Sequence, residues 1–174
     1  MWVFVTVLVV ALLVATGTSL WIDRVHDRLR EDLTSASILF EADEVRVSLA
    51  GQALMSRSVT WKKGELLVTD QAAVIFPRGP MFKQQPIVLL REANDQPGAG
   101  GLGTIRIVVT GPPEHGRTAV IGAPAVTLRG SGPASSRWTV TLQTAGLGPL
   151  MDALRSFVRG PQAEASDSIP TTEN

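Results

Sequence analysis

The sequence predicts an all-β fold, an antiparallel β-jellyroll or roll, preceded by a transmembrane helix and followed by a short amphipathic helix. Three observations lead to this prediction. From residue 38 the helical period gives way to short alternating or continuous apolar runs, Gly and Pro separate the runs, and no helical period returns before residue 147. About nine or ten short runs, with turn signals every 8 to 14 residues, are typical of an antiparallel sandwich, roll or barrel.

The composition excludes several classes of protein. The 174 residues suffice for one domain of ordinary size with accessory segments. The 16 basic and 16 acidic side chains balance, so we expect no nucleic-acid partner. The absence of cysteine excludes disulfides, thiolate metal sites and cysteine nucleophiles. The 2 histidines are far apart in the sequence, so we expect no metal site, no catalytic triad and no cofactor.

Residues 1–22 form the predicted anchor. They read MWVFVTVLVVALLVATGTSLWI and include no charged side chain. A helix of this length, at about 1.5 Å per residue, spans the roughly 30 Å of bilayer hydrocarbon. Trp2 and Trp21 lie at its two ends, where indole rings favour the headgroup level. Because no Lys or Arg precedes this long apolar run, it predicts a retained single-pass anchor in the inner (cytoplasmic) membrane rather than a cleaved signal peptide.

The orientation of the anchor has two interpretations. Arg24, Arg28 and Arg30 follow the helix, and the positive-inside rule would therefore keep the next domain in the cytoplasm. Large domains translocate largely regardless of charge, however. We expect the β domain on the periplasmic, or extracytoplasmic, side.

Residues 23–36 continue the helix beyond the anchor. Val25, Leu29 and Leu33 recur at helical spacing, and charged residues of both signs fill the other faces. This pattern is typical of a juxtamembrane extension with ion pairs along it. The alternative is a helix whose three apolar residues bind a membrane partner.

Residues 37–146 form the predicted β domain. In EVRVSLAG the side chains of Val45, Val47 and Leu49 share one face. Two breaks, Lys63-Gly64 and Asp70-Gln71, flank the next apolar run and are expected to be corners of the sheet. The predicted runs that surround and follow them are ALMSRSVTW, ELLVT, AAVIF, PIVLLR, TIRIVVTG, TAVIG, AVTLRG and RWTVTLQT.

The C-terminal segment divides into two parts. Residues 147–159 predict an amphipathic helix, because Leu150, Leu154, Phe157 and Val158 form one stripe. This helix is expected to pack against the sheet or plug one of its ends. Residues 160–174 are polar and rich in Pro and Ser, which predicts disorder.

None of the apparent motifs predicts catalysis. Residues 98–103 read GAGGLG, but a dinucleotide fingerprint must open a helix, and here a strand follows, so we expect a loop. Asp70, Glu65 and Glu41 lie in or beside turns without a histidine or nucleophile at a suitable spacing. Ser56 and Ser58 lack the elbow of a nucleophilic serine. We predict no enzyme, and a membrane-anchored hydrolase using Asp70 or Glu65 is the weakest alternative.

The segment from Glu41 to Gly79 resembles the repeat unit of the lipopolysaccharide-transport β-jellyroll family, of the LptA/OstA type. The matching features are the opening Glu41-Ala42-Asp43, the first turn at Gly51, a hairpin from Val59 to Gly64 and a corner from Leu67 to Asp70. The match covers about 40 residues. An N-terminal anchor followed by one small β domain is an LptC-like layout.

The resemblance implies a membrane-anchored protein that shields or passes lipid, of the lipopolysaccharide type, across the cell envelope as part of a transport complex. Its partners would be an inner-membrane transporter and a neighbouring β-jellyroll protein. An apolar interior would keep acyl chains from water, which is worth about 0.8 kcal/mol per buried CH₂. The lipid-binding wall would consist of Val47, Leu49, Val59, Trp61, Leu66, Val68, Val74 and Phe76.

The alternative function is a structural or assembly adaptor. Its β domain would have a solid core and carry no lipid. Val25, Leu29 and Leu33, together with the anchor, would bind its membrane partner.

Overall fold

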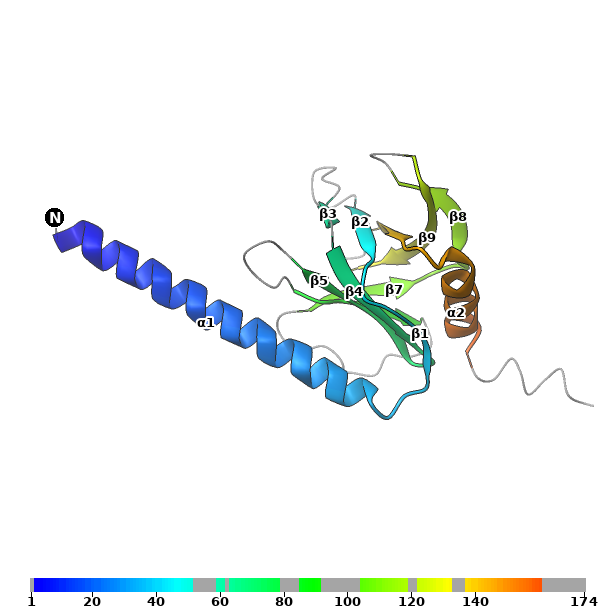
Figure 1. Cartoon of the computed structure of the whole chain (residues 1–174), viewed down its shortest axis with the longest axis horizontal. Coiled ribbons are helices and arrows are strands. Elements are labelled where there is room, and N and C mark those ends of the chain that lie inside the picture. Colours follow the sequence, from blue (N-terminus) through cyan, green and yellow to red (C-terminus); the bar gives the residue numbers. More distant parts are fainter. Residues whose placement is uncertain are drawn as a thin grey trace, which may run out of the picture.

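Figure 1 shows the computed structural model of the chain. The structure describes residues 2–51, 59–61, 63–78, 85–91, 104–118, 122–132 and 137–160, and of residues 2–5, 8–13, 15, 19, 59–61 and 63 it describes the backbone alone. The predicted loop at 98–103, the predicted disordered tail after Gly160, and Ser56 and Ser58 lie outside the described residues.

Two helices and ten strands make up the described part of the chain, which is therefore mainly β, as predicted. The helices are α1 (Trp2–Leu33) and α2 (Leu147–Arg159). The strands are β1 (Ile38–Ala42), β2 (Arg46–Gly51), β3 (Val59–Trp61), β4 (Lys63–Thr69), β5 (Ala72–Arg78), β6 (Ile87–Arg91), β7 (Ile105–Val109), β8 (Glu114–Arg117), β9 (Pro124–Ser131) and β10 (Arg137–Gln143).

Helix α1 runs without interruption through the predicted anchor and most of the predicted juxtamembrane extension, and it ends at Leu33 instead of residue 36 (Figure 1). Val7, Val14 and Leu20 on this helix are exposed. Within the described residues, no helix is both long enough and apolar enough to cross a membrane. The anchor stays a prediction from the sequence.

The strands form one open, mixed sheet in the order β1-β4-β5-β6-β7-β9-β10-β2-β3, and β8 pairs with β9 outside this path. Strands β6 and β7 are parallel, and the other pairs are antiparallel. The expectation of a purely antiparallel sheet was therefore wrong for one pair. Alternation predicts which face a residue occupies, but it carries no information about strand direction.

A long, bent hairpin folds the sheet back on itself. Ala42 pairs with Leu66 in β1 and β4, and the same register continues to Val47 opposite Trp61 in β2 and β3. At the bend, the amide of Val45 donates a hydrogen bond of 2.8 Å to the carbonyl of Gly64. Because β4 also pairs with β5 while β2 pairs with β10, the hairpin links two layers that face each other.

The opposite corner lies between β7 and β9. These strands pair at two positions, Val108 with Ser131 and Val109 with Gly130. A Cβ atom on Gly130 would lie 2.5 Å from both Ile107 Cγ2 and the Val108 carbonyl oxygen. Glycine is therefore required here because the two backbones approach closely.

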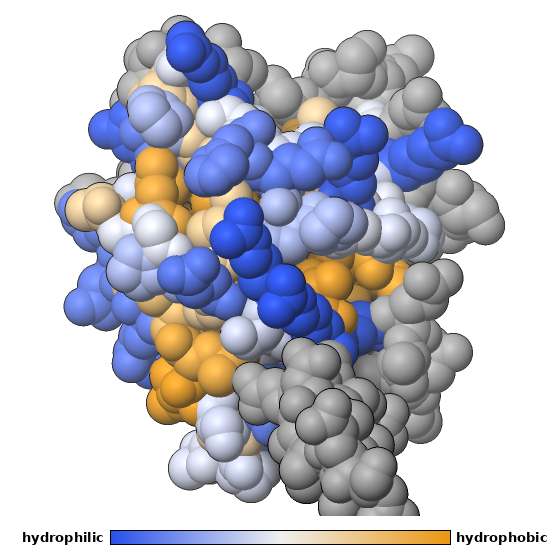
Figure 2. All heavy atoms as spheres, turned by 90° about the vertical axis from the view of Figure 1, so that its right-hand side faces the viewer, coloured by the Kyte–Doolittle hydropathy of each residue, from blue (hydrophilic) through white to orange (hydrophobic). Residues whose placement is uncertain are grey.

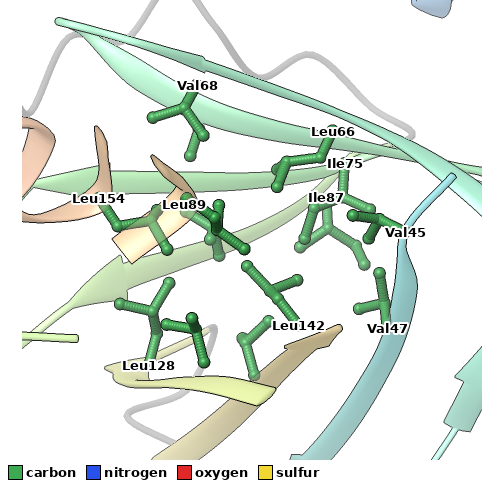
Figure 3. Close-up of a cluster of buried hydrophobic side chains, with 14 of the residues drawn as sticks. Val45, Val47, Leu66, Val68, Ile75, Ile87, Leu89, Leu128, Leu142 and Leu154 are labelled. Carbon is green, nitrogen blue, oxygen red and sulfur yellow. The ribbon is translucent and has the colours of Figure 1, made fainter. Parts of the chain in front are cut away.

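The hydrophobic core fills the space between the two layers (Figure 3). Inward residues of β4, β5 and β6 lie on one side, those of β2, β9 and β10 on the other, and α2 lies at one end. Helix α2 contributes Leu150, Leu154 and Phe157, each 0% exposed, whereas Val158 is half-buried. The stripe predicted from helical spacing is therefore the buried face of α2.

Strand β8 was not predicted. Its four residues, EHGR, include no apolar side chain that could alternate with polar ones, and all four are exposed or half-buried. The hydrophobic pattern therefore does not predict this strand. The predicted strand TAVIG instead follows β8, and its residues 119–121 lie outside the described part of the chain.

Candidate functional site

The residues predicted to line one lipid-binding wall occupy two faces of the sheet. Val47, Leu49, Leu66 and Val68 point into the space between the layers, and each is between 0 and 3% exposed. Figure 3 shows Val47, Leu66 and Val68 directed into this interior. Alternation predicted this inward face for Val47 and Leu49, whereas the run ELLVT admitted either face, and the register of the sheet turns Leu66 and Val68 inward.

Val74 and Phe76 lie on the outer face of β5, which corrects the sequence-based grouping. In the register of β4 with β5, Leu66 is opposite Ile75, whereas Glu65 is opposite Phe76. Ala73 and Ile75 therefore take the inward positions. Because AAVIF is apolar at every position, alternation alone could not choose between its two faces. Of Val59 and Trp61, the remaining two, the structure describes the backbone alone.

The inward-facing residues form one packed cluster. Side chains from both layers meet each other and the apolar stripe of α2 (Figure 3). The exposed side of α2 carries Asp152, Arg155, Ser156 and Arg159. The end of the molecule seen in Figure 2 is accordingly mainly hydrophilic, with apolar patches between the polar side chains. In the described part of the chain, the interior is thus a filled core with a helix closing one end.

The outer face of β5 and β6 is covered by the base of α1. Leu29 and Leu33, at 5% and 6% exposure, pack with Val74, Phe76 and Val88. Half-buried Val25 packs against the same cluster. The three residues predicted to bind a partner therefore contact the sheet of their own chain, while partner binding stays a prediction.

An ion-pair network adjoins this apolar contact. The Glu65 side chain is 7% exposed, and its two carboxylate oxygens accept hydrogen bonds from Arg30 of α1 and from Arg78, the latter at 3.1 Å. The Arg30 guanidinium lies 5.3 Å from the centre of the Phe76 ring, and the His26 ring, tilted by 58° to the Phe76 ring, has its centre 5.0 Å away. We call the packing of Leu29 and Leu33 against the sheet, together with this network, the α1 clasp.

A cavity of about 240 Å³ lies within the α1 clasp, bordered by His26, Asp27, Arg30, Glu65, Phe76 and Arg78. Because both oxygens of Glu65 are engaged by arginines, this carboxylate is placed to hold α1 rather than to accept a proton from a substrate. Arg30 and Arg78 are 53% and 57% exposed, so water screens the pairs and their contribution to stability is modest.

The other two carboxylates considered for catalysis are those of Asp70, which forms hydrogen bonds at a corner of the sheet, and Glu41, which is exposed. Asp70 accepts a hydrogen bond of 3.1 Å from the amide of Ser37, and its own amide donates one to the Ser37 carbonyl. It therefore fixes the corner between β4 and β5 against the start of β1. Glu41 is exposed on β1. Among the described residues, no group of three or more metal-ligating side chains gathers.

A larger cleft, of about 970 Å³, lies along parts of β2, β9 and β10. The described residues that line it are Ala50, Gly51, Thr110, Thr127, Arg129, Gly130, Ser131, Arg137, Trp138 and Thr139. No feature of the sequence was interpreted as part of this cleft. The outward positions of the three predicted strands carry Arg, Thr and Ser side chains, which is the only sequence feature that points to the cleft. The sequence does not give the pairing register, and that register places these side chains next to one another.

No family model matches the chain, and no curated protein matches it. The resemblance to the β-jellyroll family therefore rests on residues 41–79 alone.

Proposed function

We propose that this protein is a membrane-anchored structural or assembly adaptor whose β domain has a solid core. The observation that carries this proposal is the α1 clasp. Leu29 and Leu33 are buried against the sheet, and Glu65 joins Arg30 of the helix to Arg78 of β5. A helix held by both apolar burial and ion pairs sets the orientation of the β domain, as a docking module requires.

The membrane attachment in this proposal rests on the sequence. Residues 1–22 carry no charge, and α1 exposes Val7, Val14 and Leu20, which supports insertion into lipid. The first residue of the clasp, His26, lies about one helical turn beyond the proposed anchor, so the β domain would lie beside the bilayer. We place this domain on the extracytoplasmic side of the inner membrane, where it binds a membrane protein and performs no catalysis.

A second candidate function is favoured by the position of α2. The two layers enclose an apolar space, and α2 fills one end of it with Leu150, Leu154 and Phe157. If α2 left this place, the exposed groove would suit acyl chains. The protein would then shield or pass lipid of the lipopolysaccharide type between an inner-membrane transporter and a neighbouring β-jellyroll protein, as the resemblance implies.

Photo-crosslinking in native membranes separates the two functions. A crosslinking residue at Val68 probes the interior, and one at Leu20 serves as the control on the proposed anchor. The adaptor predicts lipid adducts at Leu20 and adducts only within the chain at Val68. Lipid adducts at Val68 would overturn the adaptor and support lipid shielding, while a lack of lipid at Leu20 would overturn the anchor.

The adaptor also predicts that the α1 clasp is needed for assembly. Replacing both Leu29 and Leu33 with Asp should release the base of α1 and remove the chain from its membrane complex on a native gel. Glu31→Lys, an exposed change on the same helix, is the control and should leave the complex intact. An unchanged complex in the double variant would refute this role of the clasp.

A further inference from the structure

The cleft along β2, β9 and β10 has a composition unlike that of the core. Its outward-facing lining consists of short hydroxyl side chains and two arginines, Arg129 and Arg137. In the register of the sheet, Ala50, Thr139 and Arg129 lie side by side on three neighbouring strands. The small side chain of Ala50 leaves room at the edge of this row, and Thr127 and Ser131 extend it along β9.

The adjoining row is built around Trp138. This residue pairs with Gly51 on one side and Gly130 on the other. A Cβ atom on Gly51 would lie 3.0 Å from the indole ring, and one on Gly132 would lie 2.3 Å from its Nε1 atom. The indole therefore lies over glycine backbone on the core side of these strands, on the opposite face from the side chains of Arg129 and Thr139.

The charge of the cleft is positive. None of the described residues that line it is acidic. A carboxylate oxygen of Glu114 in β8 lies 3.1 Å from a guanidinium nitrogen of Arg129, and this ion pair neutralises part of the positive charge. Arg137 is exposed and has no ion-pair partner among the residues that the structure describes. An anion would therefore find a guanidinium with free donors at this position.

We propose that this cleft binds an anionic saccharide, that is, a sugar bearing a phosphate or a carboxylate. Arg137 and Arg129 suit the anionic group, since guanidinium forks bind phosphate and carboxylate oxygens in pairs. Threonine and serine hydroxyls both donate and accept, as sugar hydroxyls require. A volume of about 970 Å³ is at the upper end of the range for small-molecule sites. This site is separate from the α1 clasp and does not depend on the adaptor function.

The test measures binding to the full chain in detergent micelles by isothermal titration calorimetry. The probes are glucose 6-phosphate, glucuronate, uncharged glucose and inorganic phosphate. Vesicles of phosphatidylcholine with and without phosphatidylinositol present the same chemistry as a lipid headgroup. The variants are Arg137→Gln, which removes the guanidinium, and Arg155→Gln, which makes the same change in charge on the exposed face of α2.

We expect the charged sugars to bind more tightly than glucose and than inorganic phosphate. Arg137→Gln should weaken that binding by roughly tenfold or more, as for the loss of a hydrogen bond to a charged group, whereas Arg155→Gln should have no effect. Binding to phosphatidylinositol vesicles would assign the ligand to a lipid headgroup, and binding to the free sugars alone would assign it to a soluble saccharide. Equal binding of glucose and glucose 6-phosphate, equal effects of the two variants, or no binding of any probe would overturn the proposal.

Discussion

Replacing Leu154 with Ala tests whether α2 is part of the core. Leu154 is 0% exposed and lies in the cluster formed by both layers of the sheet (Figure 3). Losing its buried isopropyl group costs about 2 kcal/mol in transfer free energy. The cavity left between the layers adds to this, so the total should be about 3 kcal/mol, within the range of about 2–5 kcal/mol for buried Leu→Ala changes. Alanine is a good helix former, so helix propensity contributes little to the difference.

The assay is urea unfolding of the full chain in a mild detergent, followed by near-ultraviolet circular dichroism. A loss of about 3 kcal/mol should also lower Tm by roughly 6–12 °C for a chain of this size. Arg155→Ala, the adjacent exposed position on α2, is the matched control and should change the free energy of unfolding by less than about 0.5 kcal/mol. A loss below about 1 kcal/mol for Leu154→Ala would show that α2 adds little to the core. That result would refute the solid core and favour an interior open to lipid.

Two further predictions concern the α1 clasp and the corner of the sheet. Glu65→Gln should weaken the contacts to Arg30 and Arg78 and speed hydrogen exchange of the amides at the base of α1, with Glu114→Gln, an exposed acid in a surface pair, as the control. Equal exchange in both variants would contradict a role for Glu65 in holding the helix. Gly130→Ala should cost about 1–3 kcal/mol, because its Cβ would meet the Val108 carbonyl at 2.5 Å, whereas a Cβ at Gly111 meets nothing within 4 Å. Thermal unfolding that is the same for Gly130→Ala and Gly111→Ala would show that β7 and β9 are not held together at this corner.

Local pattern was enough to predict much of the fold. Short alternating runs with Gly and Pro between them predicted a β domain, and helical spacing predicted the stripe of Leu150, Leu154 and Phe157 on α2. In β2, where one face is apolar and the other polar, alternation also identified the inward residues. These features depend on the period of the backbone, which neighbouring residues determine by themselves.

Other features depended on which strands are neighbours. AAVIF is buried on both faces, one by the core and the other by α1, so its pattern could not show that Val74 and Phe76 face the helix. The parallel pairing of β6 with β7 and the exposed strand β8 likewise left no mark in the hydrophobic period.

What the sequence by itself determined is therefore the type of each long element and the inward face of each strand that has one polar side. Only the tertiary structure decided what those elements form together. In the sequence, Glu65 is an acidic residue beside a predicted turn, with no visible partner. In the folded chain, Arg30, thirty-five positions earlier, and Arg78 each donate a hydrogen bond to one of its two carboxylate oxygens. The arginines and hydroxyls of the cleft become one surface through the register of three strands. The physical reason is that charge and hydrogen-bonding groups act through space, and their distances are set by chain pairing rather than by sequence separation.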